Sequence, residues 1–276
     1  MSATAPLRGA VETAPVVPLR SERVVRGSGP SHSSASRRRP PRMRSAARSR
    51  ERWALILLRD PGEEETVVPL LRGVSHALAF WLALIAAFVL VIVAPGPGRA
   101  PALVYGIGLC ALFAISGLYH RWRWDRRWRP LLRRLDHSTI YVFIAASWTP
   151  LGLLLLSGPM RMIVVLGVWF SALCGVVLSL AWIAAPRVLV AVSYVAVGCV
   201  AIAALPQLLD RLGTAPIVLL GLGALLYCLG AGVYAFKRPD PWPSTFGFHE
   251  VFHSLVILAA ASHFVAMAGW IIPNAA

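Results

Sequence analysis

The sequence is short of charged residues. Only 14% of its 276 residues are Asp, Glu, Lys or Arg, whereas 57% are hydrophobic, and the mean hydropathy is +0.67. Soluble globular domains are about 25% charged, so this composition excludes an ordinary soluble domain. It also excludes a chain that is disordered throughout, because disorder requires low hydrophobicity and high charge. The composition predicts a membrane protein.

Cysteine is also scarce, and its spacing is uninformative. The four cysteines, Cys110, Cys174, Cys199 and Cys228, lie inside apolar stretches and form no CxxC pair. A thiolate metal site and a disulfide framework are therefore not expected. We expect these residues to be small, buried packing groups.

Acidic residues are outnumbered, with 12 Asp and Glu against 27 Lys and Arg, giving a net charge of +15. Residues 1–52 hold twelve of the Arg and only three Glu, among many Ser and Pro. We predict a disordered tail over 1–52 whose partner is anionic lipid headgroups, with no nucleic acid expected. Residues 53–72 are interpreted as an amphipathic lead-in to a membrane domain spanning 73–276.

Seven long apolar runs follow the tail. Each is close to the roughly 20 residues that a helix needs to cross the hydrocarbon core of a bilayer. Backbone groups cannot be left unpaired in lipid, so runs of this length must be helices. The sequence predicts an all-α bundle of seven transmembrane helices. The runs cover about 73–94, 101–120, 138–157, 162–185, 188–206, 215–236 and 249–272.

Basic residues are distributed unequally between the two sets of loops. The loops after the second, fourth and sixth runs carry ten Lys and Arg, whereas the opposite loops carry Arg99, Arg161 and Arg211. Short loops rich in Lys and Arg stay in the cytoplasm. We therefore expect a multi-pass protein of the plasma membrane with a cytoplasmic N-terminus and its C-terminus outside.

Three histidines are expected to meet at the cytoplasmic side. His249 and His253 are four residues apart, about 40° around a helix and 6 Å along it, so their rings share one face. His120 ends the second run on the same side of the membrane. Three imidazoles with an open fourth position are typical of catalytic zinc. Iron, copper and nickel also accept imidazole, so zinc is the favoured metal among several.

Two further polar residues are candidates for catalysis. Asp136 precedes the third run at the same depth, where it is placed to accept a proton from a metal-bound water. Ser116 lies one turn before His120 on the same helical face and is placed to position that water. The remaining His76, His137 and His263 are expected to be hydrogen-bond partners between helices.

The segment HEVFH, residues 249–253, also matches the HExxH pattern of zinc proteases. In those enzymes the glutamate is the general base, but Glu250 points about 100° away from His249 on a helix. An intramembrane metalloprotease remains an alternative that we do not favour. Thr149 and Pro150, in the segment SWTP, are expected to kink the third helix.

Four separated segments resemble the hemolysin III family, the bacterial branch of the progestin and adipoQ receptor (PAQR) superfamily. They are RGVSHALAF, SGLYH, LDHSTIYVFIAASWTP and FGFHEVFHSLVILAAASHF, in that order. The resemblance covers residues 66–276. It implies a seven-helix fold with a cytoplasmic N-terminus and a zinc ion near the inner face.

The resemblance also implies roles for individual residues. Ser116 and His120 match the family's S-x-x-x-H, Asp136 its acidic residue, and His249 and His253 its H-x-x-x-H. The implied function is a metal-dependent hydrolase acting on lipid amide bonds, as a ceramidase does, or a factor in membrane-lipid homeostasis. The alternatives are a pore-forming cytolysin and a receptor or sensor with structural zinc. The substrate and oligomeric state are not indicated.

Overall fold

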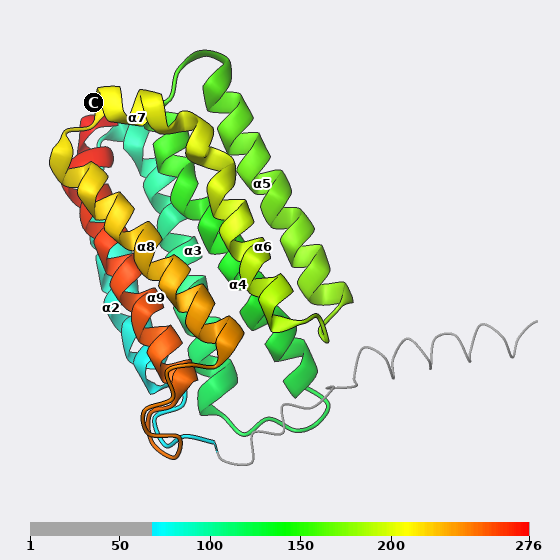
Figure 1. Ribbon diagram of the computed structural model, residues 1–276. Coiled ribbons are helices and arrows are strands. Elements are labelled where there is room, and N and C mark those ends of the chain that lie inside the picture. The colour runs from blue at the N-terminus through cyan, green and yellow to red at the C-terminus, as the bar shows by residue number, and fades with distance from the viewer. Residues whose placement is uncertain (1–67, 276) are drawn as a thin grey trace, which may run out of the picture. The chain divides into compact units, whose positions relative to one another are not determined.

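The computed structural model describes residues 68–275. The tail over 1–52 and residues 53–67 of the lead-in lie outside this range. Between residues 68 and 275 the ordered elements are all helical, and the one β-bridge, between Trp242 and Phe246, closes a loop. The described helices run alongside one another (Figure 1).

Seven helical stretches are long and apolar enough to cross a membrane, which confirms the predicted seven-helix architecture. Three of them contain a change of helix type near one end. The elements are α2 (Val74–Val93), α3 (Gly96–Arg121), α4 (Arg129–Pro150) with the π-helical turn η1 (Leu151–Leu155), α5 (Gly158–Ala181), α6 (Arg187–Cys199) with the 3₁₀ turn η2 (Val200–Ala204) and α7 (Leu205–Arg211), α8 (Thr214–Phe236), α9 (Phe248–Ala266) with the π-helical turn η3 (Met267–Ile271), and a final 3₁₀ turn η4 (Pro273–Ala275).

The third span begins earlier than the apolar run suggested, at Arg129 instead of residue 138. Arg133 and Arg134, expected in a loop, are buried side chains of α4. Arg134 Nε donates a hydrogen bond to the Leu180 carbonyl, 3.0 Å away, near the end of α5. This bond to a group near a helix end makes the buried Arg134 tolerable at this position. Because α4 begins at Arg129, Asp136 lies inside the helix and not before it.

The fifth span is interrupted. The apolar run at 188–206 predicts one continuous helix, but the α-helix ends at Cys199 and restarts as α7 after a 3₁₀ turn. Pro206 lies at the start of α7. Proline has no N–H and its ring clashes with the carbonyl four residues earlier, so a helix breaks just before it.

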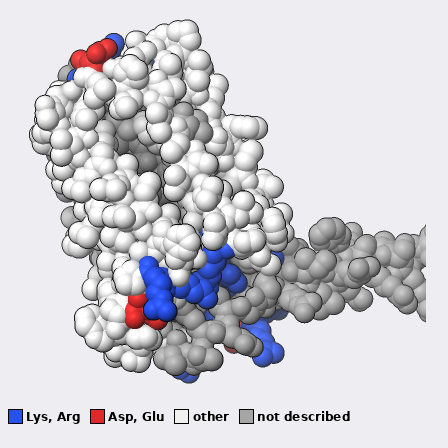
Figure 2. All heavy atoms as spheres, viewed as in Figure 1, with Lys and Arg blue, Asp and Glu red and all other residues white. Residues whose placement is uncertain are grey.

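The outward faces of the helices are apolar. Large side chains such as Phe88, Phe170 and Leu225 are exposed, as expected for surfaces that face lipid acyl chains. On the face shown in Figure 2, the charged side chains gather at the two ends and the surface between them is uncharged. This distribution fits a protein embedded across a bilayer.

The prediction that the cysteines are buried was wrong. Cys174, Cys199 and Cys228 are exposed and Cys110 is half-buried, and all four are free thiols. An apolar neighbourhood in the sequence of a membrane protein can mean lipid as easily as protein interior. Hydropathy alone therefore does not separate the two environments.

The basic loops share one end of the bundle, as the alternation of helices requires. We call this the basic end; it contains residues 68–72 and the loops at 122–128, 182–186 and 237–247. Two backbone hydrogen bonds join its parts, from Leu70 N to Ser244 O at 3.0 Å and from Leu71 N to Thr245 O at 3.1 Å. The start of α2 is thereby fixed to the loop that leads into α9.

Candidate metal centre

The three predicted histidines converge at the basic end. His120 extends from the last turn of α3, and His249 and His253 from the first two turns of α9. The Nε2 atoms of His120 and His249 are 3.1 Å apart. One nitrogen from each of the three rings lies within 4.8 Å of the other two. The three histidines therefore lie close together, as their helical spacing and membrane depth predicted.

The first turn of α2 completes the packing around His120. Gly73, which precedes α2, has a φ of +73°, a conformation that favours glycine. A Cβ atom at Gly73 would lie 2.6 Å from the Cβ of His120. The absence of a side chain thus allows the α2 backbone to lie directly against the His120 side of the cluster.

Asp136 lies beside His120 and is only 8% exposed. Its Oδ2 is 3.5 Å from His120 Nε2, and its carboxylate also interacts with the Ser116 hydroxyl. It is not one of the three ligand groups that share a common centre. The carboxylate is therefore adjacent to the cluster, where it can contact a fourth ligand.

His76 was not counted as part of the site, yet it lies against it. As expected, it makes a hydrogen bond between helices: His76 Nδ1 on α2 and Ser116 Oγ on α3 are 2.8 Å apart. Its ring also stacks on His253, with centroids 3.7 Å apart and planes 5° from parallel. Its position at the start of the first run, on the side where the other histidines meet, was the signal that could have found it.

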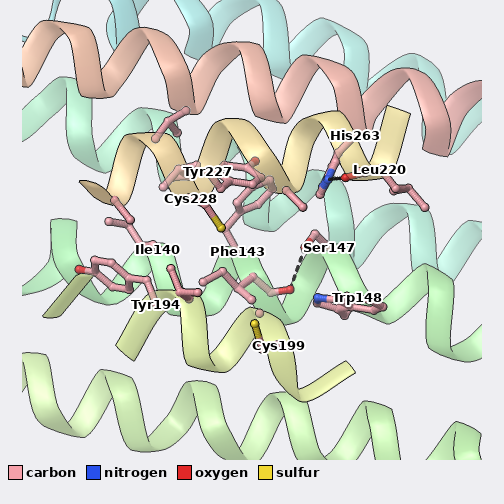
Figure 3. A pocket seen from close by; sticks show the side chains of 18 of the residues that line it. Ile140, Phe143, Ser147, Trp148, Tyr194, Cys199, Leu220, Tyr227, Cys228 and His263 are labelled. Atoms are coloured by element: carbon pink, nitrogen blue, oxygen red, sulfur yellow. Dashed lines mark hydrogen bonds between the residues drawn. The ribbon is translucent and has the colours of Figure 1, made fainter. Parts of the chain in front are cut away.

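The other two histidines lie outside the cluster. His263 Nε2 hydrogen-bonds to the Leu220 carbonyl of α8 at 3.0 Å (Figure 3), which confirms its expected role between helices. The His137 ring faces Tyr234, with centroids 6.1 Å apart. Neither belongs to the group of His120, His249 and His253.

Glu250 has structural partners instead of facing the cluster as a base. Its Oε2 accepts a hydrogen bond of 2.8 Å from Gly247 N–H, which caps α9. Its Oε1 lies 3.2 Å from Arg72 Nε in a buried ion pair. Both carboxylate oxygens have partners, so Glu250 is not placed to act as the general base that the HExxH pattern of a metalloprotease requires.

The three histidines could hold a metal ion. Zinc binds imidazole nitrogen at about 2.0–2.1 Å, which places two ligand nitrogens about 3.3 Å apart. The separation of 3.1 Å between His120 and His249 is close to this value. His253 Nδ1 is buried with no hydrogen-bond partner. A nitrogen-only donor set suits zinc first, and iron, copper or nickel also.

An apolar cavity of about 380 Å³ begins at this cluster and continues between α4, α6, α8 and α9. His76, Ser116, Asp136 and His253 line one part of it, and His263 lines another. Figure 3 shows part of its wall, where most of the labelled side chains are apolar or aromatic. Its volume is in the range of about 300–1,000 Å³ found for small-molecule sites.

Fold and site together define a seven-helix membrane protein with a three-histidine cluster beside an acidic residue, and with an apolar cavity that reaches His253 and Asp136. The family model described as "Haemolysin-III related" matches residues 65–264. The chain belongs to this hemolysin III family, within the PAQR superfamily, which confirms the resemblance noted in its sequence motifs. It is an integral, multi-pass membrane protein, and the plasma membrane is the usual location of bacterial members.

Curated relatives are similar over most of their length. The hemolysin-3 homolog of Bacillus subtilis is 30% identical over 196 residues, covering 70% of this chain and 89% of the relative. Hemolysin-3 of Bacillus cereus is 27% identical over 207 residues, or 74% and 91% of the two chains. The human monocyte to macrophage differentiation factor is 30% identical over 173 residues, or 61% and 69%.

Proposed function

We propose that this protein is a zinc-dependent hydrolase that cleaves the amide bond of a membrane lipid, as a ceramidase does. One observation carries the proposal: an apolar cavity reaches Asp136 and His253, and His253 belongs to the three-histidine cluster. The cavity provides apolar walls for an acyl chain, and the cluster provides the donors for a metal. A carbonyl at the head of the chain would then lie beside His253 and Asp136.

His120, His249 and His253 would hold the ion. When bound, zinc would polarise the carbonyl of the substrate and activate a water molecule. The Asp136 carboxylate accepts a proton from the attacking water and returns it to the leaving nitrogen as the C–N bond breaks and a C–O bond forms. The products are a fatty acid and an amine, and no further reactant is consumed beyond water.

Ser116 and His76 support this arrangement. The Ser116 hydroxyl lies 2.8 Å from His76 Nδ1 and also interacts with the Asp136 carboxylate. In this position Ser116 orients Asp136 toward the attacking water. His76 stacks on His253 and so restricts the rotation of that ring. The apolar walls of the cavity limit the access of bulk water to the reacting bond.

We further propose that the reaction takes place at the inner leaflet. Ten Lys and Arg in or near the loops of the basic end, against Arg99, Arg161 and Arg211 near the other end, favour a cytoplasmic location for the basic end. The cavity is partly open, and its lining residues Cys199 of α6 and Cys228 of α8 are exposed. This supports entry of a lipid chain from the bilayer between α6 and α8.

The test uses protein purified in detergent and returned to vesicles. Zinc is measured per chain, and released fatty acid is measured for a panel containing a ceramide, other N-acyl lipids and an ester phospholipid. We expect one zinc per chain and release from an N-acyl lipid that is lost in His253→Ala. Stoichiometric zinc with no product from any lipid, and unchanged membrane lipids in cells carrying His253→Ala, would contradict the hydrolase.

Two alternatives have an observation in their favour. The B. cereus relative is named a hemolysin, and dye release from vesicles that persists in His120→Ala would favour pore formation without metal. The cluster also joins α3 to α9, which a purely structural zinc would do. In that case histidine variants should lose thermal stability, and Asp136→Asn should keep all function.

A further inference from the structure

The Arg72–Glu250 ion pair is almost completely buried, although neither residue is a candidate metal ligand. Arg72 is 6% exposed and Glu250 is 2% exposed. The pair joins the segment before α2 to the first turn of α9, where Glu250 lies next to His249 in sequence. An ion pair taken out of water costs desolvation, so it is weak support for stability alone. Its location beside the histidines therefore calls for another explanation.

The same short segment contacts every part that carries a candidate ligand. Residues 70 and 71 hydrogen-bond to the backbone of residues 244 and 245, in the loop before α9. Gly73 lies against His120 at the end of α3. Glu250 completes the connection by capping α9 through Gly247. Residues 70–73 thus hold α3 and α9 in register at the point where the three imidazoles meet.

We propose that Arg72 and Glu250 are positioning residues that set the affinity of the metal centre. This inference rests on the proposed metal site and assigns a role to two residues outside its ligand set. Glu250 fixes the first turn of α9, and with it His249 and His253, through its two oxygens. Arg72 fixes Glu250 relative to α2 and, through Gly73, relative to His120.

The charges of the pair predict an asymmetry between the two single substitutions. Arg72 lies within electrostatic range of His249 and His253. Glu250→Gln keeps an oxygen that can cap Gly247, but it removes the negative charge that pairs with Arg72 next to the divalent ion. Arg72→Gln removes a cation from the surroundings of the metal and leaves a carboxylate there. Glu250→Gln should therefore weaken zinc binding more than Arg72→Gln does.

The experiment measures zinc release to a chelator and thermal unfolding of the metal-free protein, using full-length chain in detergent. The variants are Glu250→Gln, Arg72→Gln and the double substitution. Arg99→Gln is the control, because Arg99 Nε donates a hydrogen bond to the Ala94 carbonyl at the opposite end of the bundle, away from the histidines. Loss of supporting contacts around a metal typically costs about 10–100-fold in affinity.

We expect about 100-fold weaker zinc binding for Glu250→Gln, about 10-fold for Arg72→Gln, and partial recovery in the double variant, whose two amides can bond to each other. Arg99→Gln should bind zinc as wild type does. Wild-type zinc affinity in both single variants would overturn the positioning role of Arg72 and Glu250 but not the proposed metal site. If all three variants lost zinc affinity and the thermal stability of the metal-free protein to the same extent, the pair would have a structural role only. Absence of zinc from the wild type would overturn the proposed hydrolase as well.

Discussion

Helix α9 carries histidines at two depths, and the two places differ in the groups that surround the imidazoles. At the basic end, His249 and His253 lie close to His120, Asp136 lies beside His120, and the His76 ring stacks on His253. Ten residues beyond His253, His263 contacts the Leu220 carbonyl and the ring of Tyr227, 5.5 Å away between centroids. Both places border the same cavity.

The comparison indicates that the neighbours of a histidine, and not histidine itself, make a candidate metal site inside a membrane bundle. A single imidazole that hydrogen-bonds to a carbonyl links two helices, and such a hydrogen bond contributes about 0.6 kcal/mol on average in membrane proteins. Three imidazoles with an unsatisfied nitrogen and a nearby carboxylate form a donor set for an ion. The two ends of α9 therefore provide a built-in comparison for every measurement.

The largest expected effect is on metal content when a histidine of the cluster is removed. In His253→Ala we expect zinc to fall from about one per chain to well below that, because two nitrogens cannot complete a tetrahedral site. Elemental analysis of purified protein measures this directly. His263→Ala is the matched control from the same helix and should retain full zinc. Equal zinc loss in the two variants would remove the distinction between the two places.

The next effect separates chemistry from binding. Asp136→Asn keeps the shape of the side chain but cannot accept the proton of the attacking water. We expect about 10²–10⁴-fold lower turnover of an N-acyl lipid, the usual contribution of a general base, with zinc content and thermal midpoint near wild type. Unchanged turnover would show that Asp136 has no part in the reaction and would favour a structural zinc.

A smaller effect is expected where α2 lies against His120. Gly73→Ala adds a Cβ 2.6 Å from that of His120 at a residue with φ of +73°. The backbone conformation alone costs about 1–2 kcal/mol for an L-residue, and relieving the clash must move His120. We expect a lower thermal midpoint together with weaker zinc binding. Gly198→Ala, where no atom lies within 4 Å of the added Cβ, controls for the glycine substitution itself.

The sequence predicted the spans and the histidine cluster because both depend on simple periodicities. A run of about 20 apolar residues must be helical in lipid, and alternation of helix direction brings His120 to the depth of His249. These two constraints are independent, and they agreed. The same reasoning placed Asp136 at the correct depth, although it put that residue before the helix instead of inside it.

What the sequence could not give is which side chains meet across helices. Nothing in the apolar pattern indicates that His76 stacks on His253, because stacking depends on the rotation of α2 about its axis. The partner of Glu250 was equally hidden, since Arg72 lies 178 positions earlier in the chain. Exposure of Cys174, Cys199 and Cys228 also depends on helix rotation, which hydropathy does not encode when both lipid and protein are apolar.

The smallest expected effect concerns the packing of His263 itself. Gly223 leaves room for this ring, because a Cβ there would lie 2.2 Å from His263 Cδ2. His263→Ala loses one hydrogen bond, about 0.6 kcal/mol and at most about 1.7 kcal/mol, so a slight fall in thermal midpoint is expected. Gly223→Ala alone should destabilise more, because the ring must move. The double variant should be more stable than Gly223→Ala, since the added methyl then occupies the space that the imidazole has left, while zinc content stays at the wild-type value in all three.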